Sequence, residues 1–322
     1  MNKYIHYTII FSISLISLYF AFSGEDIHLV LSKIKKVKLS GVVLAILVLL
    51  SSCLIRAYRW RLLIEPLDQL SLKHVFSATM IGYFGNGVLA FRLGEILKSY
   101  SVSKNTGLKI SQAIGTVILE RILDLMMVIL LGLILVPWIP NQFLQVKNTL
   151  FVLLVLIIAF ILITIGLVKM KYNFGKKYSI FFLSINSKIF VHLISVYEGI
   201  KVIIDNRNLK RILFSSVLLW LIYFGVTLIV LKSCSIELKV SEASILFVLG
   251  SLALGIPALP GSIGTYDVAV KYILIAIFNI ENHEALNYAL ISHAVSYFPL
   301  TIVGAVYFII GNVRIKTLKN IN

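Results

Sequence analysis

The sequence predicts an all-α polytopic membrane protein, and three observations lead to this fold class. Hydrophobic residues make up 59% of the 322 residues and charged residues only 14%, whereas soluble domains carry about 25% charged residues. Many of the apolar residues lie in runs of about 20, the length at which an α-helix crosses the hydrocarbon core. The net charge of +16 arises from basic residues that flank these runs, which favours attraction to anionic lipid headgroups over a nucleic-acid partner.

About eight hydrophobic segments are expected, and six of them are predicted to cross the membrane completely. These six cover residues 1–23, 40–58, 110–136, 149–168, 211–231 and 285–311. The first ends in Ala21-Phe22-Ser23, which leaves a cleaved signal peptide open as an alternative, although further spans follow it. The second closes with Arg56, Arg59 and Trp60, and aromatic and basic residues together are typical of the cytoplasmic membrane interface.

The two remaining segments, 72–91 and 241–258, are apolar but broken. Glycines and an asparagine interrupt the first, at Gly82, Gly85, Asn86 and Gly87, and Pro257 and Pro260 end the second. Non-helical backbone at membrane depth needs protein or water around it. We therefore expect two re-entrant helical hairpins, over residues 75–103 and 245–280.

The distribution of basic residues predicts which way the chain runs. With both hairpins re-entrant and the N-terminus inside, 20 basic residues face the cytoplasm and seven face outside, among them the four at 33–38. If 72–91 crossed the membrane completely, the nine basic residues of 169–211 would face outside, against the positive-inside rule. The expected location is the cell membrane, plasma or inner, with both termini cytoplasmic.

The whole chain, 1–322, is interpreted as a single integral membrane domain with two halves, 1–136 and 149–311. Residues 169–210 are expected to contain a basic amphipathic helix that lies on the cytoplasmic membrane face and connects the halves. Each half then contains a broken hairpin, and the halves have opposite orientations. Inverted repeats whose broken helices meet at the midplane are typical of secondary transporters.

The span 110–136 differs from the others because Glu120, Arg121 and Asp124 lie near its middle. Each charge there costs about 2.5–3.5 kcal/mol on insertion scales, so the three side chains need partners or water. At about 100° per residue, Glu120 and Asp124 share one helix face with Arg121 beside them, and Thr116 extends the polar stripe. Two interpretations stay open: an internal ion-pair lock between packed helices, or a polar cavity for a charged ligand.

The broken segments also predict an anion site. A helix that starts at membrane depth exposes backbone N–H groups that attract anions, so Arg92, Arg121 and such a terminus are predicted to hold a phosphate headgroup together. The sequence has no nucleotide loop, zinc spacing or serine–histidine–acid order. We therefore predict no cofactor, no metal and no catalytic residue, and we interpret His293 as a hydrogen-bonded membrane histidine.

Four short motifs occur along the chain. They are Arg56-x-x-Arg59-Trp60, Arg92-x-Gly94-Glu95, Glu120-Arg121-x-x-Asp124 and Pro260-Gly261-Ser262-x-Gly264-x-x-Asp267. As a set they resemble the flippase-like transmembrane domain of the lysylphosphatidylglycerol synthases, the multiple peptide resistance factor family, in a stand-alone form without the aminoacyl-transferring domain. The resemblance implies eight hydrophobic segments and movement of a modified phospholipid between leaflets. Ser262 stands where the family usually has Gly, and Asp267 where it usually has Glu.

The predicted function is translocation of a phospholipid or lipid-linked headgroup, aminoacylated or glycosylated, between leaflets. The predicted substrate-binding residues are Arg92, Glu95, Glu120, Arg121, Asp124, Gly261, Gly264 and Asp267, and the predicted interface or structural residues are Arg56, Arg59 and Trp60. The arginines Arg92 and Arg121 are expected to contact phosphate. The acids Glu120, Asp124 and Asp267 are expected to adjust the local charge or to pair with a cationic headgroup.

Two other function classes stay open. One is a membrane transferase that acts on lipid headgroups, such as a phosphatidylglycerol lysyltransferase, with Glu120 or Asp267 as general base. The other is a non-catalytic membrane partner of a separate glycosyl or aminoacyl transferase. The expected partners are membrane lipids with anionic phospholipid headgroups, such a lipid-modifying transferase, and a second copy of the chain in a homodimer, but no nucleic acid.

Overall fold

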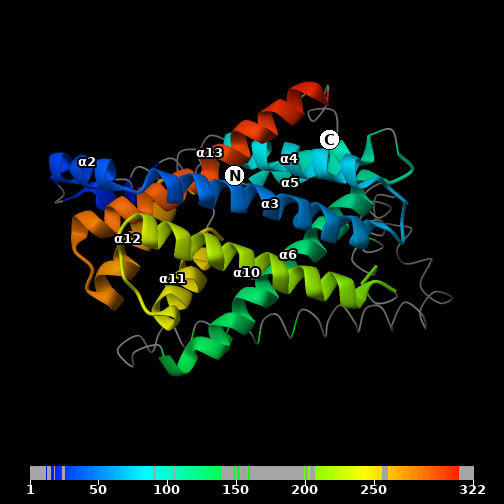
Figure 1. The fold of residues 1–322 in the computed structure, drawn as a ribbon. Coiled ribbons are helices and arrows are strands. Elements are labelled where there is room, and N and C mark those ends of the chain that lie inside the picture. Colours follow the sequence, from blue (N-terminus) through cyan, green and yellow to red (C-terminus); the bar gives the residue numbers. More distant parts are fainter. Residues whose placement is uncertain are drawn as a thin grey trace.

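The computed structural model describes residues 26–89, 92–104, 106–138, 207–255 and 260–311, together with residues 19–23 and isolated positions elsewhere. Every regular element in these ranges is a helix (Figure 1). In chain order the helices are α2 (Ile27–Lys36), α3 (Leu39–Ile64), α4 (Leu72–Val88), α5 (Gly94–Ser103), α6 (Ile110–Leu135), η2 (Val136–Trp138), α10 (Leu209–Ser233), α11 (Val240–Ala253), η4 (Pro260–Ser262), α12 (Thr265–Phe278) and α13 (Asn282–Ile310).

Four segments in the described part are long and apolar enough to cross a membrane. They are α3, α10, α13 and the 19 residues of Pro260–Phe278, which join η4 to α12. Helix α6 has 26 residues, as many as α3, but carries three charges at its centre. The all-helical class is confirmed for the described residues, whereas six full spans were predicted and four candidates are found. Most of the predicted spans 1–23 and 149–168 and of the linker 169–210 falls outside the described residues.

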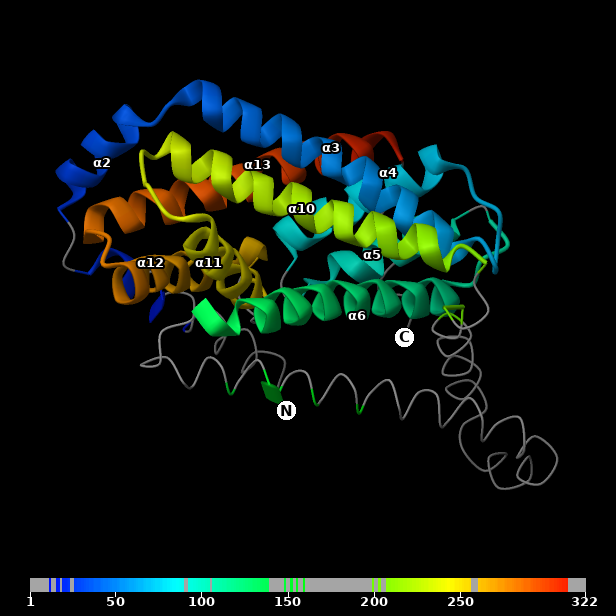
Figure 2. The same ribbon diagram turned by 60° about the horizontal axis from the view of Figure 1, so that its bottom comes forward.

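Helices α3 and α10 run alongside each other in opposite directions (Figure 2). Near one end of the pair, Asn208 just before α10 donates to Glu65 just after α3 over 2.9 Å. At the other end, the Lys38 amide just before α3 donates to the carbonyl of Ser233, the last residue of α10, over 3.0 Å. The pair thus defines two ends of the bundle.

Helices α4 and α5 form a hairpin that leaves and returns at the end of the bundle where α3 ends. The Gly107 amide after α5 donates to the Asp68 carboxylate before α4 over 3.1 Å. His74 Nε2 in the first turn of α4 lies 2.9 Å from the carbonyl oxygen of Val102 near the end of α5. Helix α6 therefore starts beside the point where the chain left α3.

The glycines of α4 were predicted to break the segment, and this prediction is wrong, because α4 continues through them to Val88. They allow close packing instead. A Cβ atom on Gly85 would lie 2.5 Å from the Cα atom of Gly94 on α5, and one on Gly87 would collide with the side chain of Thr301 on α13. The glycine pattern is therefore a helix-packing signal here, as is common in membrane helices.

Helices α11 and α12 form a second helix pair at the opposite end, where α10 ends. A buried apolar cluster there combines Ile236 before α11, Ala243 near the start of α11, Leu274 near the end of α12 and Ala285 near the start of α13. In Figure 1, α11 and α12 lie to the left and α4 and α5 towards the right. The two helix pairs thus start from opposite ends of α3.

The turns of the two pairs are linked by hydrogen bonds. The Tyr297 hydroxyl on α13 donates to the carbonyl of Gly87 near the end of α4 over 2.9 Å. The Arg92 guanidinium, just before α5, donates to the carbonyl of Leu254, just after α11. The turn of α4–α5 therefore contacts both the end of α11 and α13.

Candidate functional site

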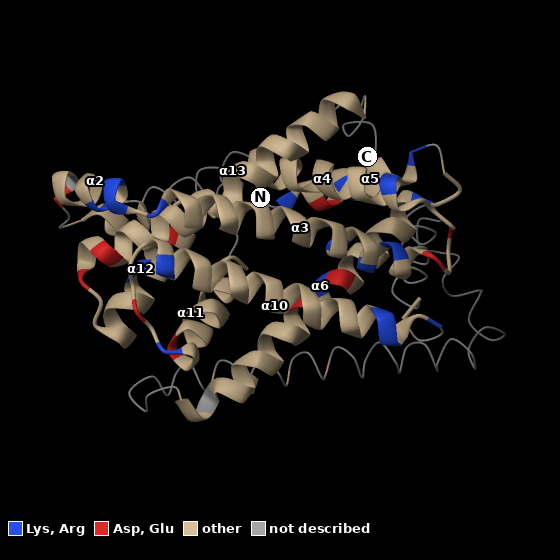
Figure 3. Cartoon of the chain, in the orientation of Figure 1, with Lys and Arg blue, Asp and Glu red and all other residues tan. Residues whose placement is uncertain are grey.

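Charged side chains from three helices form a buried ion network between α3, α5 and α6. Figure 3 shows charged residues on α6 in the middle of an otherwise largely uncharged bundle. Glu120 Oε1 lies 2.8 Å from Arg56 Nε and Glu120 Oε2 lies 2.6 Å from Lys98 Nζ. The Asp124 carboxylate lies 2.7 Å from Arg56 Nη2 and 2.6 Å from Arg59 Nη2. None of these five residues is more than 9% exposed.

Helical periodicity explains why these groups meet. Glu120 and Asp124 are four residues apart on α6, and Arg56 and Arg59 are three apart on α3, so each pair shares one helix face. The Thr116 hydroxyl, one turn before Glu120, accepts a hydrogen bond of 3.1 Å from the indole of Trp60. The predicted polar stripe of α6 therefore faces α3 at Thr116, and partners on other helices neutralise both carboxylates.

Arg56, Arg59 and Trp60 lie inside the bundle, although the sequence indicated the membrane interface. Arg59 and Trp60 are fully buried and Arg56 is 6% exposed. Two polar residues of α10 complete the surroundings: Ser216 accepts from Arg59 over 3.1 Å, and Tyr223 accepts from Arg56 over 3.1 Å. The physical reason is that the buried carboxylates of α6 require counterions, and the two arginines supply them.

Lys98 is the member of the network that sequence reasoning missed. Its ammonium reaches Glu120 and also lies 3.9 Å from the centroid of the Trp60 ring, a distance suited to a cation–π interaction. The signal in the sequence is a single lysine within the otherwise uncharged stretch 96–103. Such a residue in a segment predicted to enter the membrane needs a carboxylate partner.

The network extends towards the surface through Arg121 and Glu95. Arg121 Nε lies 2.6 Å from Glu95 Oε1, and Arg121 Nη1 lies 3.6 Å from Asp124 Oδ2. The side chains of Arg121 and Glu95 are 35% and 21% exposed. Arg92 is exposed and close enough to Arg121 and Glu95 to interact with both electrostatically. Five of the predicted site residues are therefore in one place.

Cations outnumber carboxylates in this network among the described side chains. With all groups ionised, four cations face three carboxylates, and Arg92 adds a further positive charge. The cations are Arg56, Arg59, Lys98 and Arg121, and the carboxylates are Glu95, Glu120 and Asp124. The buried Nε of Arg59 has no hydrogen-bond acceptor within the described part of the chain. The arrangement can accept an anion.

The other three predicted residues, Gly261, Gly264 and Asp267, form a second centre with His293 of α13. The Asp267 carboxylate accepts from the Gly264 amide over 3.0 Å, and its two oxygens lie 2.8 and 3.0 Å from His293 Nδ1. His293 Nε2 lies 2.8 Å from the Gly261 carbonyl oxygen. His293 is thus hydrogen-bonded on both ring nitrogens, which confirms its interpretation as a hydrogen-bonded histidine.

The backbone before α12 explains the glycines. Gly261 and Gly264 have φ angles of +73° and +85°, in the region that glycine adopts without steric cost. A Cβ atom on Gly261 would also collide with the ring of Tyr297. Ser262 has φ +62°, which gives a physical reason why glycine would suit this position.

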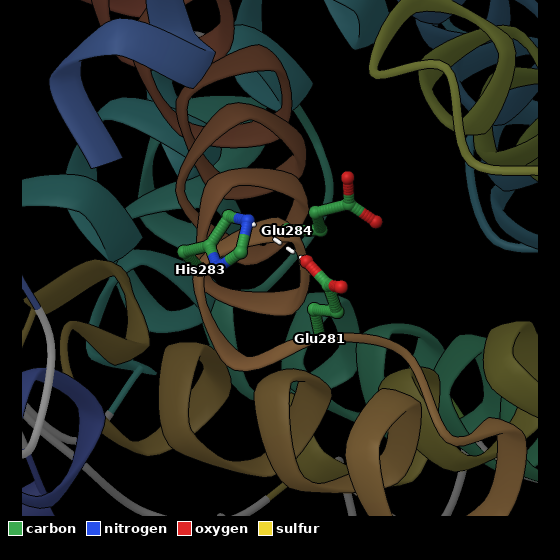
Figure 4. A group of neighbouring side chains, drawn as sticks. All are labelled: Glu281, His283 and Glu284. Carbon is green, nitrogen blue, oxygen red and sulfur yellow. Dashed lines mark ion pairs between the residues drawn. The ribbon is translucent and has the colours of Figure 1, made fainter. Parts of the chain in front are cut away.

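A third cluster, Glu281, His283 and Glu284, lies at the start of α13 (Figure 4). His283 Nε2 lies 3.1 Å from Glu281 Oε2, and Glu284 pairs with Lys33 of α2 over 2.5 Å. Glu281 is exposed and the other two are partly exposed. Surface ion pairs account for this group, and we assign no metal to it.

The family model for the lysylphosphatidylglycerol synthase TM region matches residues 7–304, a range that contains both buried centres and both helix pairs. The chain belongs to this family. The resemblance carried by the four sequence motifs is thereby confirmed, and the chain is a polytopic membrane protein of the lysylphosphatidylglycerol synthase TM region family.

UPF0104 membrane proteins are among the relatives of this family member. A UPF0104 membrane protein of Methanocaldococcus jannaschii is 28% identical over 244 residues, which cover 74% of this chain and 98% of the relative. A UPF0104 membrane protein of Methanothermobacter thermautotrophicus is 24% identical over 284 residues, covering 83% of this chain and 82% of the relative. The matches span most of both chains, so the similarity concerns most of the membrane domain.

Proposed function

We propose that this protein moves a lipid with an anionic headgroup between the two leaflets of the membrane. The observation that carries the proposal is the ion network of α3, α5 and α6, in which cations outnumber carboxylates. A buried surplus charge is unfavourable unless a counterion compensates it. Arg121 and Arg92, at the exposed edge of the network, are placed to donate charge-assisted hydrogen bonds to a phosphate.

The arrangement of the helix pairs supports transport. In our proposal, α4–α5 and α11–α12 are re-entrant hairpins that enter from opposite membrane faces, as parts of the inverted halves 1–136 and 149–311. Three observations support this: the pairs start from opposite ends of α3, α4–α5 returns to its own end, and the turns touch through Arg92 and Tyr297. Such hairpin turns form midplane sites in secondary transporters.

The contacts of the carboxylates favour transport over the transferase alternative. Glu120 is held by three cations at 2.6, 2.8 and 3.5 Å, and Asp267 is held by His293 and the Gly264 amide. A general base needs a carboxylate that is available to take a proton from the substrate. Two further expectations stay predictions: a separate transferase as partner, and a homodimer. The contacts of these carboxylates do not test either one.

Lipid movement in proteoliposomes tests the proposed function. A fluorescent phosphatidylglycerol should cross between leaflets faster with the wild-type protein than in protein-free vesicles. Arg121→Gln and Arg92→Gln should each lower this rate about tenfold, the loss expected for one charge-assisted hydrogen bond of about 1.4 kcal/mol. The matched control is Lys73→Gln, because Lys73 is an exposed cation at the start of α4. Wild-type rates no higher than those of empty vesicles would refute the proposal.

Cysteine labelling in intact cells tests the proposed topology. In this topology, the bundle end at which α3 ends faces the cytoplasm. The background replaces Cys53 and Cys234 by alanine, and the probes are Lys73→Cys and Glu237→Cys, both at exposed positions at opposite ends. An impermeant thiol reagent should label position 237 and not position 73. The opposite pattern would invert the topology, and labelling of both would contradict the two-sided arrangement.

A further inference from the structure

We propose that Asp267 and His293 form a proton-binding site, and that the bound proton holds the turn 260–264 against α13. This inference deepens the proposed function and rests on it, since the proton would supply the driving force for lipid movement. The observation that carries the proposal is that each ring nitrogen of His293 has a hydrogen-bond acceptor as its partner.

The number of protons follows from these partners. His293 Nε2 lies 2.8 Å from the Gly261 carbonyl oxygen, and a carbonyl only accepts, so Nε2 carries a proton. In a neutral imidazole Nδ1 is then an acceptor, yet it lies 2.8 Å from the Asp267 carboxylate, which also accepts when ionised. The contact is therefore made by an imidazolium beside a carboxylate or by a neutral imidazole beside a carboxylic acid. Either way the pair holds one additional proton.

The pair is buried, and two tyrosine rings border it. Asp267 is 3% exposed and His293 is 9% exposed. The Tyr266 ring on α12 lies 5.3 Å from the His293 ring, and its hydroxyl donates to Ser292. The Tyr297 ring on α13 lies 5.9 Å away, and its hydroxyl donates to the Gly87 carbonyl of α4.

The charged groups on the neighbouring elements have contacts of their own. Lys271, one turn after Asp267 on α12, donates to the Ala21 carbonyl over 2.7 Å. Lys33 of α2 pairs with Glu284 of α13, and Arg92 donates to the Leu254 carbonyl. Within the described residues, the hydrogen bonds of the Asp267–His293 pair go to each other and to the backbone of Gly261 and Gly264. A proton taken up by the pair therefore acts on the turn that these two glycines form.

Loss of the proton would break one contact. A neutral imidazole can donate to Asp267 or to Gly261, but not to both. The charge-assisted bond to the carboxylate is the stronger one, so the Nε2 lone pair would then face the Gly261 carbonyl and repel it. The proton leaves to water and no other reactant is required. The turn contacts Tyr297, which holds Gly87 of α4, so its release would reach the first hairpin as well.

Labelling of the turn tests the proton site without any measurement of lipid movement. The probe is Ser262→Cys in a background without Cys53 and Cys234, with Glu237→Cys used to correct for the pH dependence of thiol reactivity. Corrected labelling of position 262 should rise at least fivefold between pH 5 and pH 9. An unchanged corrected rate would overturn the proposal.

Two variants should shift the labelling in opposite directions. Asp267→Asn imitates the protonated acid, since an amide donates to Nδ1 while Nε2 donates to Gly261, and should keep labelling low at every pH. His293→Gln cannot bridge both partners and should keep it high. The control His283→Gln, which removes the other carboxylate-paired histidine of α13, should retain the wild-type pH response. A pH response that persists in both Asp267→Asn and His293→Gln would show that Asp267 and His293 do not bind the proton.

Lipid movement under a pH gradient then separates the two proposals. The rate in wild-type proteoliposomes should change at least fivefold when a pH difference is imposed, and an ionophore should abolish this change. Wild-type lipid movement that ignores the gradient would refute the coupling and leave the proposed function standing. Absence of lipid movement would refute the proposed function, while the labelling would still decide whether the pair binds a proton.

Discussion

The ion network of α3, α5 and α6 and the Asp267–His293 pair both bury carboxylates, yet they compensate them in different ways. In the network, Glu120 contacts three cations that come from other helices, and Asp124 contacts two. In the pair, one carboxylate, on α12, contacts one histidine, on α13. An excess of permanently charged arginines suits an anion, whereas a single histidine between two acceptors suits a proton.

The largest expected effect is the loss of a permanent charge from the network. Arg59→Gln should lower the free energy of unfolding by about 3–5 kcal/mol, because it leaves Asp124 with fewer cations in a buried site. Thermal unfolding in detergent measures this change. The matched control is Arg61→Gln on the same helix, a partly exposed arginine that should cost less than about 1 kcal/mol. Equal losses in the two variants would mean that the network does not stabilise the fold.

A medium effect is expected where the second centre depends on backbone shape. Gly261→Ala should destabilise the protein by roughly 1–3 kcal/mol, because alanine is strained in this backbone region and its Cβ would collide with Tyr297. The control is Gly225→Ala on α10, where an added Cβ has open space, and which should be neutral or stabilising by up to about 1 kcal/mol. A melting temperature unchanged in Gly261→Ala would show that the turn is not held against α13.

The smallest effect on stability is expected at the exposed edge of the network. Arg121→Gln should lower the free energy of unfolding by only about 0–1 kcal/mol, because solvent screens an exposed ion pair and this side chain is 35% exposed. The same unfolding assay, run beside Arg59→Gln, gives the contrast directly. A loss as large as that of Arg59→Gln would place Arg121 among the structural ion pairs and weaken its assignment to a lipid headgroup.

Local sequence pattern predicted the helices and part of each centre. The apolar runs predicted α3, α10 and α13 because a membrane helix depends on length and composition that a short window contains. Helical periodicity placed Glu120 and Asp124 on one face, as observed. The predicted site residues fall into two groups in the structure, with Arg92 and Glu95 beside α6 and Asp267 at the start of α12.

The partners of these residues could not be predicted from local pattern. Lys98 and Arg59 lie on helices that only the tertiary fold brings to α6. The sequence spacing of neither residue indicates an ion pair with Glu120 or Asp124. The glycines of α4 were ambiguous for the same reason, since a glycine that breaks a helix and one that admits a neighbouring helix look alike in sequence. The neighbour, Gly94 of α5, decides between the two.

The position of Lys98 above Trp60 gives the protein an internal optical reporter. Trp60 is one of three tryptophans in the chain, is fully buried, and has an ammonium group 3.9 Å from its ring centroid. The emission of an indole is sensitive to a nearby charge, so its fluorescence reads the state of the Lys98–Glu120 contact. With Trp138 and Trp220 replaced by phenylalanine, the remaining signal would follow a ligand that draws Lys98 away, in real time and without any attached dye.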